Sequence, residues 1–326
     1  MAQGIIIDTP GGVENMKYGN IPDHKLEYGE LRIKNTAIGV NYIDVYYRKG
    51  LYKCAFPNVL GIEAVGVVEE AAIDVAADFK PGDRVAYGTN TTLLGAYSTH
   101  RNMPFEYVTK IPDYISDEVA ATLMVKGMTA HMLCQRAIRM HQGWRVLVHA
   151  AAGGVGTYLC QWLKYLGAIV IGTVGSDDKI KWAEENGCTY VINYNKEDFV
   201  QKVRDYTEGA GVSVCYDSVG KDTFQKSMNC IMPFGVMISY GQSSGFVPPI
   251  EILELARTGV FLTRPTLNLY KKDYNEFIMS SVEIFEGVKN NFLRPHITHK
   301  IPLKDAAEAH KLLESRETKG SIILIP

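Results

Sequence analysis

Val146-Leu-Val-His-Ala-Ala-Ala-Gly-Gly-Val-Gly156 decides the fold, because a hydrophobic run enters a turn of small residues and a helical pattern follows. In the G-x-G-x-x-G frame the tight positions hold Ala151, Gly153 and Gly156, so alanine replaces the first glycine. Gly153 lets the backbone approach a pyrophosphate, Gly156 lets the helix pack close to the strand, and the N–H groups of the helix start suit an anion. The stretch predicts a dinucleotide-binding βαβ unit; the alternative is a tight turn without a ligand.

Strand and helix patterns alternate through residues 126–265, which predicts a doubly wound parallel sheet. The expected strands are 145–149, 169–173, 190–193, 212–217, 235–239 and 259–263, and the expected helices are 156–166, 179–186, 197–207, 221–230 and 249–257.

Up to about residue 125, short β-patterned runs separated by turn residues are typical of an irregular antiparallel barrel. These runs are 31–34, 66–70, 84–87 and 95–99. After residue 265 two amphipathic helices precede a strand at 321–325, and we expect this tail to fold back onto the barrel. The predicted domains are therefore residues 1–125 with 266–326, and residues 126–265.

The composition is that of a globular protein, and its charge does not favour binding to polyanions. The 326 residues carry a net charge of -2 and no basic tract, which argues against nucleic acid or an anionic membrane surface as a partner. No apolar run approaches the roughly 20 residues of a membrane span, and the first residues lack a signal-peptide layout. The six cysteines form no C-x-x-C pair and indicate reduced thiols, so we expect a cytoplasmic protein.

The end of the second strand bears on the choice of dinucleotide. An acid about 20 residues past the glycine turn binds the ribose 2′-hydroxyl of NADH. The sequence places Gly175 or Ser176 there, which leaves room for a 2′-phosphate, with Lys179 as its charge partner and Ser176 as a hydrogen-bond donor. NADPH is therefore the expected cofactor. A competing register puts Asp177 in the acid position. In a purely structural interpretation, Asp177 or Asp178 is an ordinary helix cap and Lys179 is a solvated side chain.

Several residues close the apolar runs of the later strands, where ligands lie in open α/β sheets. The candidate cofactor contacts at these strand ends are Tyr194, Ser218, Tyr240, Gly241 and Arg264.

Over its whole length the chain resembles the medium-chain dehydrogenase/reductase superfamily, and within it the quinone oxidoreductase (zeta-crystallin-like) family. The motifs that carry the resemblance are residues 37–44, 61–66, 81–85, 126–130, 150–156, 216–220 and 263–265. The resemblance implies a Rossmann doubly wound parallel sheet inserted into a GroES-like β-barrel catalytic domain, and a homodimer. It also implies cofactor contacts from Asn41, Thr129, Ala152, Gly153, Gly154, Val155 and Gly156.

The chain departs from the zinc-dependent relatives at the ligand positions. Where those enzymes have Cys, His and Cys or Glu, the matching residues are Asn41, Ile62 and Lys126, and no cysteine lies between Cys54 and Cys134. A zinc site needs three protein ligands, which these side chains do not supply. We therefore expect no metal, and no Lewis acid to polarise a simple alcohol or aldehyde.

A quinone is the expected substrate, since it accepts a hydride with little help beyond correct placement. The expected pocket wall comprises Asn41, Tyr42, Tyr46, Tyr52 and Lys126. Tyr42 and Tyr46 serve equally well as barrel core, and Lys126 is either an anchor for a developing oxyanion or a phosphate contact.

Two other functions are left open by the residues. An NADPH-dependent alkenal or enone reductase would use the same hydride delivery, with Tyr52 as the donor to the enone oxygen. An NADPH-binding structural or RNA-binding protein is the alternative of a different class, although no basic patch supports it.

Overall fold

The computed structural model describes residues 1–88, 90–270 and 273–326, and the chain divides into two compact units. The N-terminal unit comprises Met1–Met128, Tyr270–Asn291 and Pro295–Pro326, and the inserted unit comprises Thr129–Leu269 and Phe292–Arg294. The domain boundaries expected at residues 125 and 265 stay a prediction.

The inserted unit is built on a six-stranded sheet in which every neighbouring pair of strands is parallel. The strand order is β11-β10-β9-β12-β13-β14. Their bounds are β9 (Arg145–Val148), β10 (Ile169–Val174), β11 (Tyr190–Asn193), β12 (Val212–Asp217), β13 (Ile231–Ser239) and β14 (Phe261–Thr263). The order reverses direction between β9 and β12, as in the dinucleotide-binding fold. The predicted doubly wound parallel sheet is confirmed.

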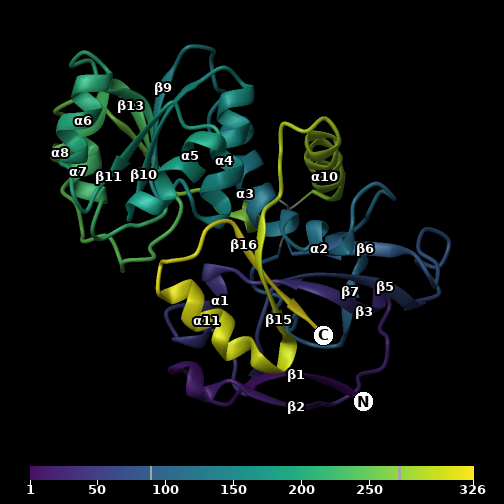
Figure 1. Cartoon of the computed structure of the whole chain (residues 1–326). Coiled ribbons are helices and arrows are strands. Elements are labelled where there is room, and N and C mark those ends of the chain that lie inside the picture. Colours follow the sequence, from purple (N-terminus) through teal and green to yellow (C-terminus); the bar gives the residue numbers. More distant parts are fainter. Residues whose placement is uncertain (89, 271–272) are drawn as a thin grey trace. The chain divides into compact units, whose positions relative to one another are not determined.

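Helices cover both faces of this sheet. Figure 1 shows α4 (Gly154–Tyr165) and α5 (Ile180–Glu185) on one side and α6 (Phe199–Tyr206) and α7 (Phe224–Ser227) on the other. The inserted unit also contains the short helices α3 (Met128–His131, from Thr129 on) and α8 (Ile252–Leu255) and a π-helical turn at Met132–Arg136. A second π-helical turn, at Leu123–Gly127, belongs to the N-terminal unit. The central strands read as continuous apolar runs because both of their faces are buried.

The N-terminal unit contains a seven-stranded sheet in the order β15-β16-β3-β5-β6-β8, with β7 also paired to β3. A separate sheet has the order β2-β1-β4. The strands are β1 (Ala2–Ile7), β2 (Lys17–Ile21), β3 (Glu30–Gly39), β4 (Asn58–Val59), β5 (Glu63–Ala71), β6 (Arg84–Tyr87), β7 (His100–Pro104), β8 (Val108–Lys110), β15 (Ile297–Pro302) and β16 (Ser321–Ile325).

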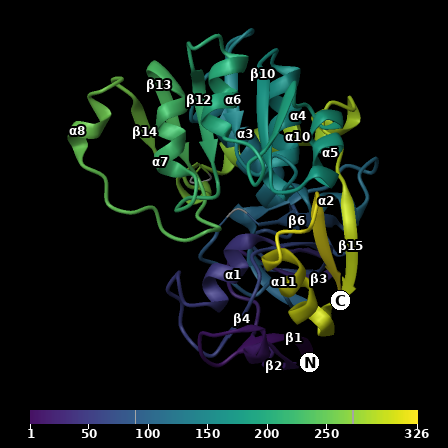
Figure 2. The same cartoon turned by 60° about the vertical axis from the view of Figure 1, so that its left-hand side comes forward.

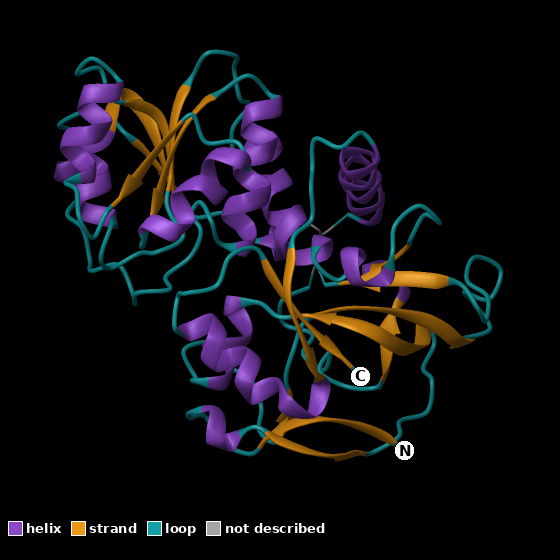
Figure 3. Ribbon diagram, viewed as in Figure 1, coloured by secondary structure: helices purple, strands orange, loops and turns teal. Residues whose placement is uncertain are grey.

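The C-terminal tail packs on the N-terminal strands, as expected, because β16 pairs antiparallel with β3 (Figures 2 and 3). The helices of the N-terminal unit are α1 (Tyr42–Arg48), α2 (Asp117–Ala120), α10 (Tyr274–Lys289) and α11 (Ala306–Glu314). Most of the short helix α9 (Leu267–Tyr270) belongs to the inserted unit. Within the described residues, no helix is long and apolar enough to cross a bilayer.

Three sequence-based elements were wrong in place or length. Residues 95–99 form a loop and the strand is β7, because Gly95 adopts a φ of 123° and the amides of Gly95 and Ala96 both donate to the carbonyl of Gly61. The helix expected at 249–257 is confined to α8, because Glu251 is extended and the amides of Ala256 and Arg257 donate three residues back in the chain, and not four. The last strand begins at Phe261 because Gly259 adopts a φ of 64°.

Candidate functional site

The glycine turn after β9 leads directly into α4. Gly153 is the N-cap of this helix, and no side chain caps the helix start. A Cβ on Gly156 would lie 2.2 Å from the carbonyl oxygen of Ala150, so this position accepts only glycine without a shift of the backbone. The first amides of α4 therefore remain available to an anion. This geometry fits the pyrophosphate of a dinucleotide and places Ala152, Gly154 and Val155 in the same turn.

The end of β10 has no side chain at the position that follows the strand. A Cβ on Gly175 would lie 2.9 Å from the hydroxyl oxygen of Tyr194, which stands against Gly175 from the end of β11. Lys179 is only 8% exposed, so it is not the solvated side chain of the competing interpretation. Ser176 donates its hydroxyl proton to Asp178 at 2.6 Å. The geometry brings Gly175, Ser176, Lys179 and Tyr194 to one end of the sheet.

The predicted residues at the ends of the next strands also gather. Gly241 packs against Ser218, because a Cβ on Gly241 would lie 2.6 Å from the Ser218 carbonyl oxygen. The Arg264 guanidinium donates to the carbonyl of Ser239 at 3.1 Å. Burial raises the pKa of Tyr240 above its ordinary value, so this phenol stays neutral. Ser218, Tyr240, Gly241 and Arg264 thus lie at the carboxyl ends of β12, β13 and β14.

Asp217 was missed by the sequence reasoning, although it shapes this region. Its carboxylate is fully buried and accepts from the amides of Val219 at 2.7 Å and Gly220 at 3.0 Å, and from the Thr223 hydroxyl at 2.9 Å. These bonds fix the turn that presents Ser218. An Asp at the end of a strand, followed by small residues, is a turn signal that could have identified it.

In the N-terminal unit, Asn41 and Lys126 meet on Glu63. The Asn41 side-chain amide donates to Glu63 Oε2 at 2.8 Å, and Lys126 Nζ lies 3.4 Å from the same oxygen. The amide of Val125 donates to Glu63 Oε1 at 2.8 Å. Glu63 is 0% and Lys126 5% exposed, so the two charges balance each other away from bulk water. Glu63 thus links Asn41 and Lys126, two residues of the expected pocket wall.

A chain of hydrogen bonds continues from Asn41 through the N-terminal unit to α11. Asp44 Oδ2 accepts from the backbone amide of Asn41 at 2.8 Å and from the Tyr97 hydroxyl at 3.0 Å. His310 Nε2 lies 3.1 Å from the Tyr97 hydroxyl, and His310 Nδ1 lies 3.2 Å from Arg48 NH1. Arg48 can only donate, so Nδ1 accepts and Nε2 carries the proton that His310 gives to Tyr97. The donors therefore run in one direction, from Arg48 through His310 and Tyr97, and Asp44 is the last acceptor.

Burial controls the protonation of both ends of this chain. Burial raises the pKa of Asp44 to about 7, against the lowering effect of its hydrogen bond from Asn41. Burial lowers the pKa of His310 to about 3, and the nearby Arg48 charge acts in the same direction. Asp44 therefore titrates near neutrality, while His310 stays neutral. The Asn-x-x-Asp capping box of α1 is the sequence signal that could have singled out Asp44.

The predicted tyrosines form one aromatic group. The ring centroids of Tyr42 and Tyr46 are 5.4 Å apart, and those of Tyr46 and Tyr52 are 5.2 Å apart. Tyr46 is 7% exposed and packs mainly as core, whereas Tyr42 and Tyr52 are half-buried. Thr129, in α3, is also half-buried. Tyr42 and Tyr52 thus have the exposure that a pocket wall requires.

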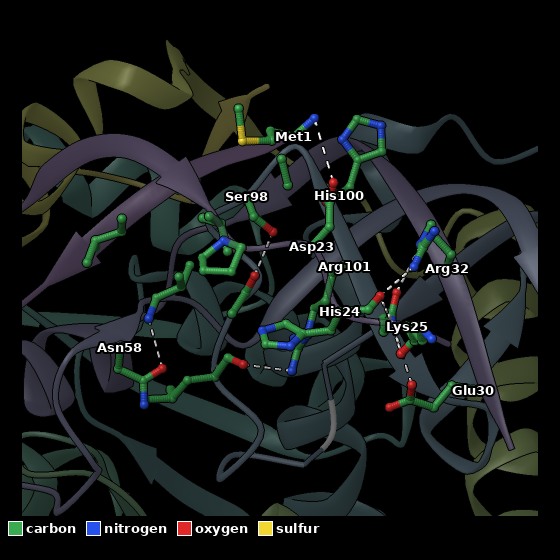
Figure 4. A pocket seen from close by; sticks show the side chains of 18 of the residues that line it. Met1, Asp23, His24, Lys25, Glu30, Arg32, Asn58, Ser98, His100 and Arg101 are labelled. Atoms are coloured by element: carbon green, nitrogen blue, oxygen red, sulfur yellow. Dashed lines mark hydrogen bonds and ion pairs between the residues drawn. The ribbon is translucent and has the colours of Figure 1, made fainter. Parts of the chain in front are cut away.

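A pocket of about 880 Å³ lies elsewhere in the N-terminal unit and contains none of the predicted site residues. Figure 4 shows its polar lining, in which Arg32 and Lys25 stand near Glu30. Arg32 donates to the carbonyl of His24 at 2.6 Å and to the Asn102 side chain at 3.2 Å. The Arg32 guanidinium thus has partners of its own.

Comparisons with known proteins agree with both units. A family profile described as an alcohol dehydrogenase GroES-like domain matches residues 27–113, and one described as a zinc-binding dehydrogenase matches residues 154–280. The 2-haloacrylate reductase of a Burkholderia species is 41% identical over 100% of this chain and 99% of that protein. Quinone oxidoreductase 1 of Escherichia coli is 39% identical over 100% of both chains.

Among solved structures, Escherichia coli quinone oxidoreductase complexed with NADPH matches with a TM-score of 0.96 at 39% identity, covering 99% of this chain and 100% of the other. The expected fold class, a doubly wound sheet inserted into a GroES-like domain, is therefore confirmed.

Proposed function

The chain belongs to the quinone oxidoreductase family of the medium-chain dehydrogenases/reductases, and from this we propose that it catalyses the reduction of a quinone by NADPH. The full-length identity of about 40% to quinone oxidoreductases carries this conclusion. NADPH is the cofactor, and it supplies the hydride when bound. The uncapped start of α4 and the buried Lys179 suit its pyrophosphate and 2′-phosphate.

The protein's own residues bind and orient the substrate. Tyr42 and Tyr52 offer flat apolar faces against which a quinone ring can lie, and their hydroxyls can donate to a quinone oxygen. Lys126, held by Glu63, supplies positive charge where negative charge develops on that oxygen. Asn41 fixes Glu63 and therefore positions Lys126. These roles support a reaction that depends on placement and charge.

Reduction of an activated double bond is the second candidate activity, and the 41% identity to a 2-haloacrylate reductase favours it. That reaction also develops negative charge on an oxygen, that of the carbonyl or carboxylate conjugated with the double bond, so Lys126 or Tyr52 would serve either substrate class. The two candidates differ in the shape of the acceptor that they require.

A comparison of acceptors decides between them. NADPH absorbance is followed with 9,10-phenanthrenequinone, 1,4-benzoquinone, 2-hexenal and 2-chloroacrylate, each at several concentrations. The proposal predicts the highest kcat/KM for a quinone. A kcat/KM for 2-chloroacrylate or 2-hexenal that exceeds those of both quinones would replace it with the double-bond reductase.

We also propose a homodimer in the cytoplasm. The strand β14 ends the sheet of the inserted unit, and its Phe261 and Leu262 side chains are 62% and 38% exposed. An apolar edge strand is a template for pairing, and pairing with a second copy across a two-fold axis would cover it. The free cysteines suit a reducing compartment. The expected absence of nucleic-acid partners stays a prediction.

A further inference from the structure

The acids that follow β10 present a problem for a protein that uses NADPH. In dinucleotide-binding folds an acid at the end of the second strand accepts the ribose 2′-hydroxyl of NADH and repels a 2′-phosphate. Asp177 and Asp178 lie two and three residues after Gly175, close to that place. An uncompensated carboxylate there would oppose the binding of NADPH.

Asp177 contacts two side chains at and just after the end of the neighbouring strand β11. Asn193, the last residue of β11, donates its side-chain amide to Asp177 Oδ1 at 2.6 Å. Lys196 Nζ forms an ion pair with Asp177 Oδ2. Both carboxylate oxygens therefore have a donor, and the hydrogen bond from Lys196 is the main cause of a lowered pKa of Asp177. The acid stays ionised, but its charge is balanced locally.

Asn193 and Lys196, the two partners of Asp177, differ in their exposure to solvent. Asn193 is 3% exposed and fixed by the strand, whereas the Asp177 and Lys196 side chains are 56% and 64% exposed. An exposed ion pair adds little to stability. Its effect on a charged ligand nearby is therefore the more consequential property, because exposed charges act over about 8 to 10 Å at physiological salt.

We propose that Asp177, Asn193 and Lys196 form a specificity-determining clamp, which neutralises the acid after β10 and so favours NADPH over NADH. The inference rests on the proposed use of NADPH. It adds residues that favour NADPH through their charge and need not contact the cofactor. Asn193 turns the carboxylate toward β11, and Lys196 cancels its charge at the 2′-phosphate. Gly175 and Tyr194 leave no room for a side chain at the strand end itself.

Binding of cofactor fragments tests the clamp without any turnover. Calorimetry is used to measure the affinities of 2′,5′-ADP, which carries the 2′-phosphate, and of 5′-AMP, which lacks it. The proteins are the wild type, K196M, D177N and the double variant D177N/K196M. Lys202→Met is the matched control, because Lys202 forms a similar exposed pair with Glu197 at 2.9 Å and does not contact Asp177.

The clamp predicts a selective effect on the phosphate. K196M should weaken the binding of 2′,5′-ADP roughly three- to ten-fold while 5′-AMP changes by less than about two-fold. D177N should bind 2′,5′-ADP at least as tightly as the wild type, and the double variant should return to the wild-type value. K202M should match the wild type with both ligands.

The results separate the clamp from the proposed function. Equal weakening of both ligands by K196M, or no weakening of either, would overturn the clamp, as would weaker 2′,5′-ADP binding by D177N. If the wild type itself binds 2′,5′-ADP no more tightly than 5′-AMP, the NADPH part of the proposed function fails instead.

Discussion

At the scale of single residues, Asp44 and His310 stand out because burial shifts their pKa values in opposite senses. Asp44 holds a proton in the native state between pH 3.8 and about 7, where the unfolded chain has lost it, so stability falls as pH rises through this window. His310 lacks a proton between about 3 and 6.5, where the unfolded chain holds one, so stability rises with pH there. The two contributions oppose each other in the wild type.

Single variants should reveal how each of the two groups makes the free energy of unfolding depend on pH. Relative to wild type, Asp44→Asn should gain stability steadily as pH rises from about 4 to 7, and His310→Gln should lose it over about pH 3 to 6.5. Urea unfolding at a series of pH values gives the free energies of unfolding. Curves for both variants that run parallel to the wild type would show that neither group titrates as the structure indicates.

Lys126 should act on the substrate and not on the cofactor. Lys126→Met should lower kcat/KM for a quinone roughly 10- to 100-fold, because positive charge is lost where negative charge develops, with little change in NADPH affinity. The double variant E63Q/K126M controls for the buried carboxylate that the single change leaves unpaired. A large loss of NADPH affinity with an unchanged quinone rate would instead make Lys126 a phosphate contact.

At the scale of elements, the two glycines of the turn between β9 and α4 have different roles: Gly156 allows close packing, and Gly153 lies in the expected cofactor site. Gly156→Ala should destabilise the protein by about 2 kcal/mol or more, because the new Cβ would press on the Ala150 carbonyl. Gly153→Ala should be tolerated better, since its Cβ would lie 3.2 Å from that oxygen, a tight contact that a small shift relieves, and it should weaken NADPH binding. Thermal unfolding and NADPH fluorescence separate the two effects. A G153A variant with normal NADPH affinity would remove this turn from the cofactor site.

The same elements show what the sequence could and could not predict. The six strands of the inserted unit were predicted because each contains an apolar run bounded by turn residues, and this holds even for β14, whose Phe261 and Leu262 are exposed. The helix α1 was not predicted. It is only 7 residues long, and its capping box lies within residues 37–44, which were interpreted as a family motif. The strand β15 was also missed, because its exposed and half-buried residues alternate around a single buried Ile301.

The candidate site divides in the same way. The glycine turn and the strand ends are local in sequence, and their grouping follows from the parallel sheet. The chain from Asp44 through Tyr97 to His310 joins residues that lie far apart in the sequence, with Arg48 and His310 separated by 262 positions. No local pattern brings such residues together, so only the folded structure could reveal them.

At the scale of the whole molecule, the exposed strand β14 predicts self-association. Leu262→Lys, at the edge of the sheet, should shift the protein from dimer to monomer in sedimentation experiments, because a charge at an apolar edge opposes pairing. Ile73→Lys is the control, since Ile73 is 90% exposed in the N-terminal unit. A wild type that sediments as a monomer, or an L262K variant that stays dimeric, would contradict the proposed interface.

The central claim is that this chain transfers reducing equivalents from NADPH to a quinone, and an anaerobic stoichiometric titration tests it most directly. Enzyme and a fixed amount of NADPH are mixed with increasing 9,10-phenanthrenequinone, and both chromophores are followed, with NADH in a parallel series. We predict one NADPH consumed per quinone reduced and a much slower reaction with NADH. No quinone-dependent loss of NADPH absorbance, or equal rates with both nucleotides, would contradict the account.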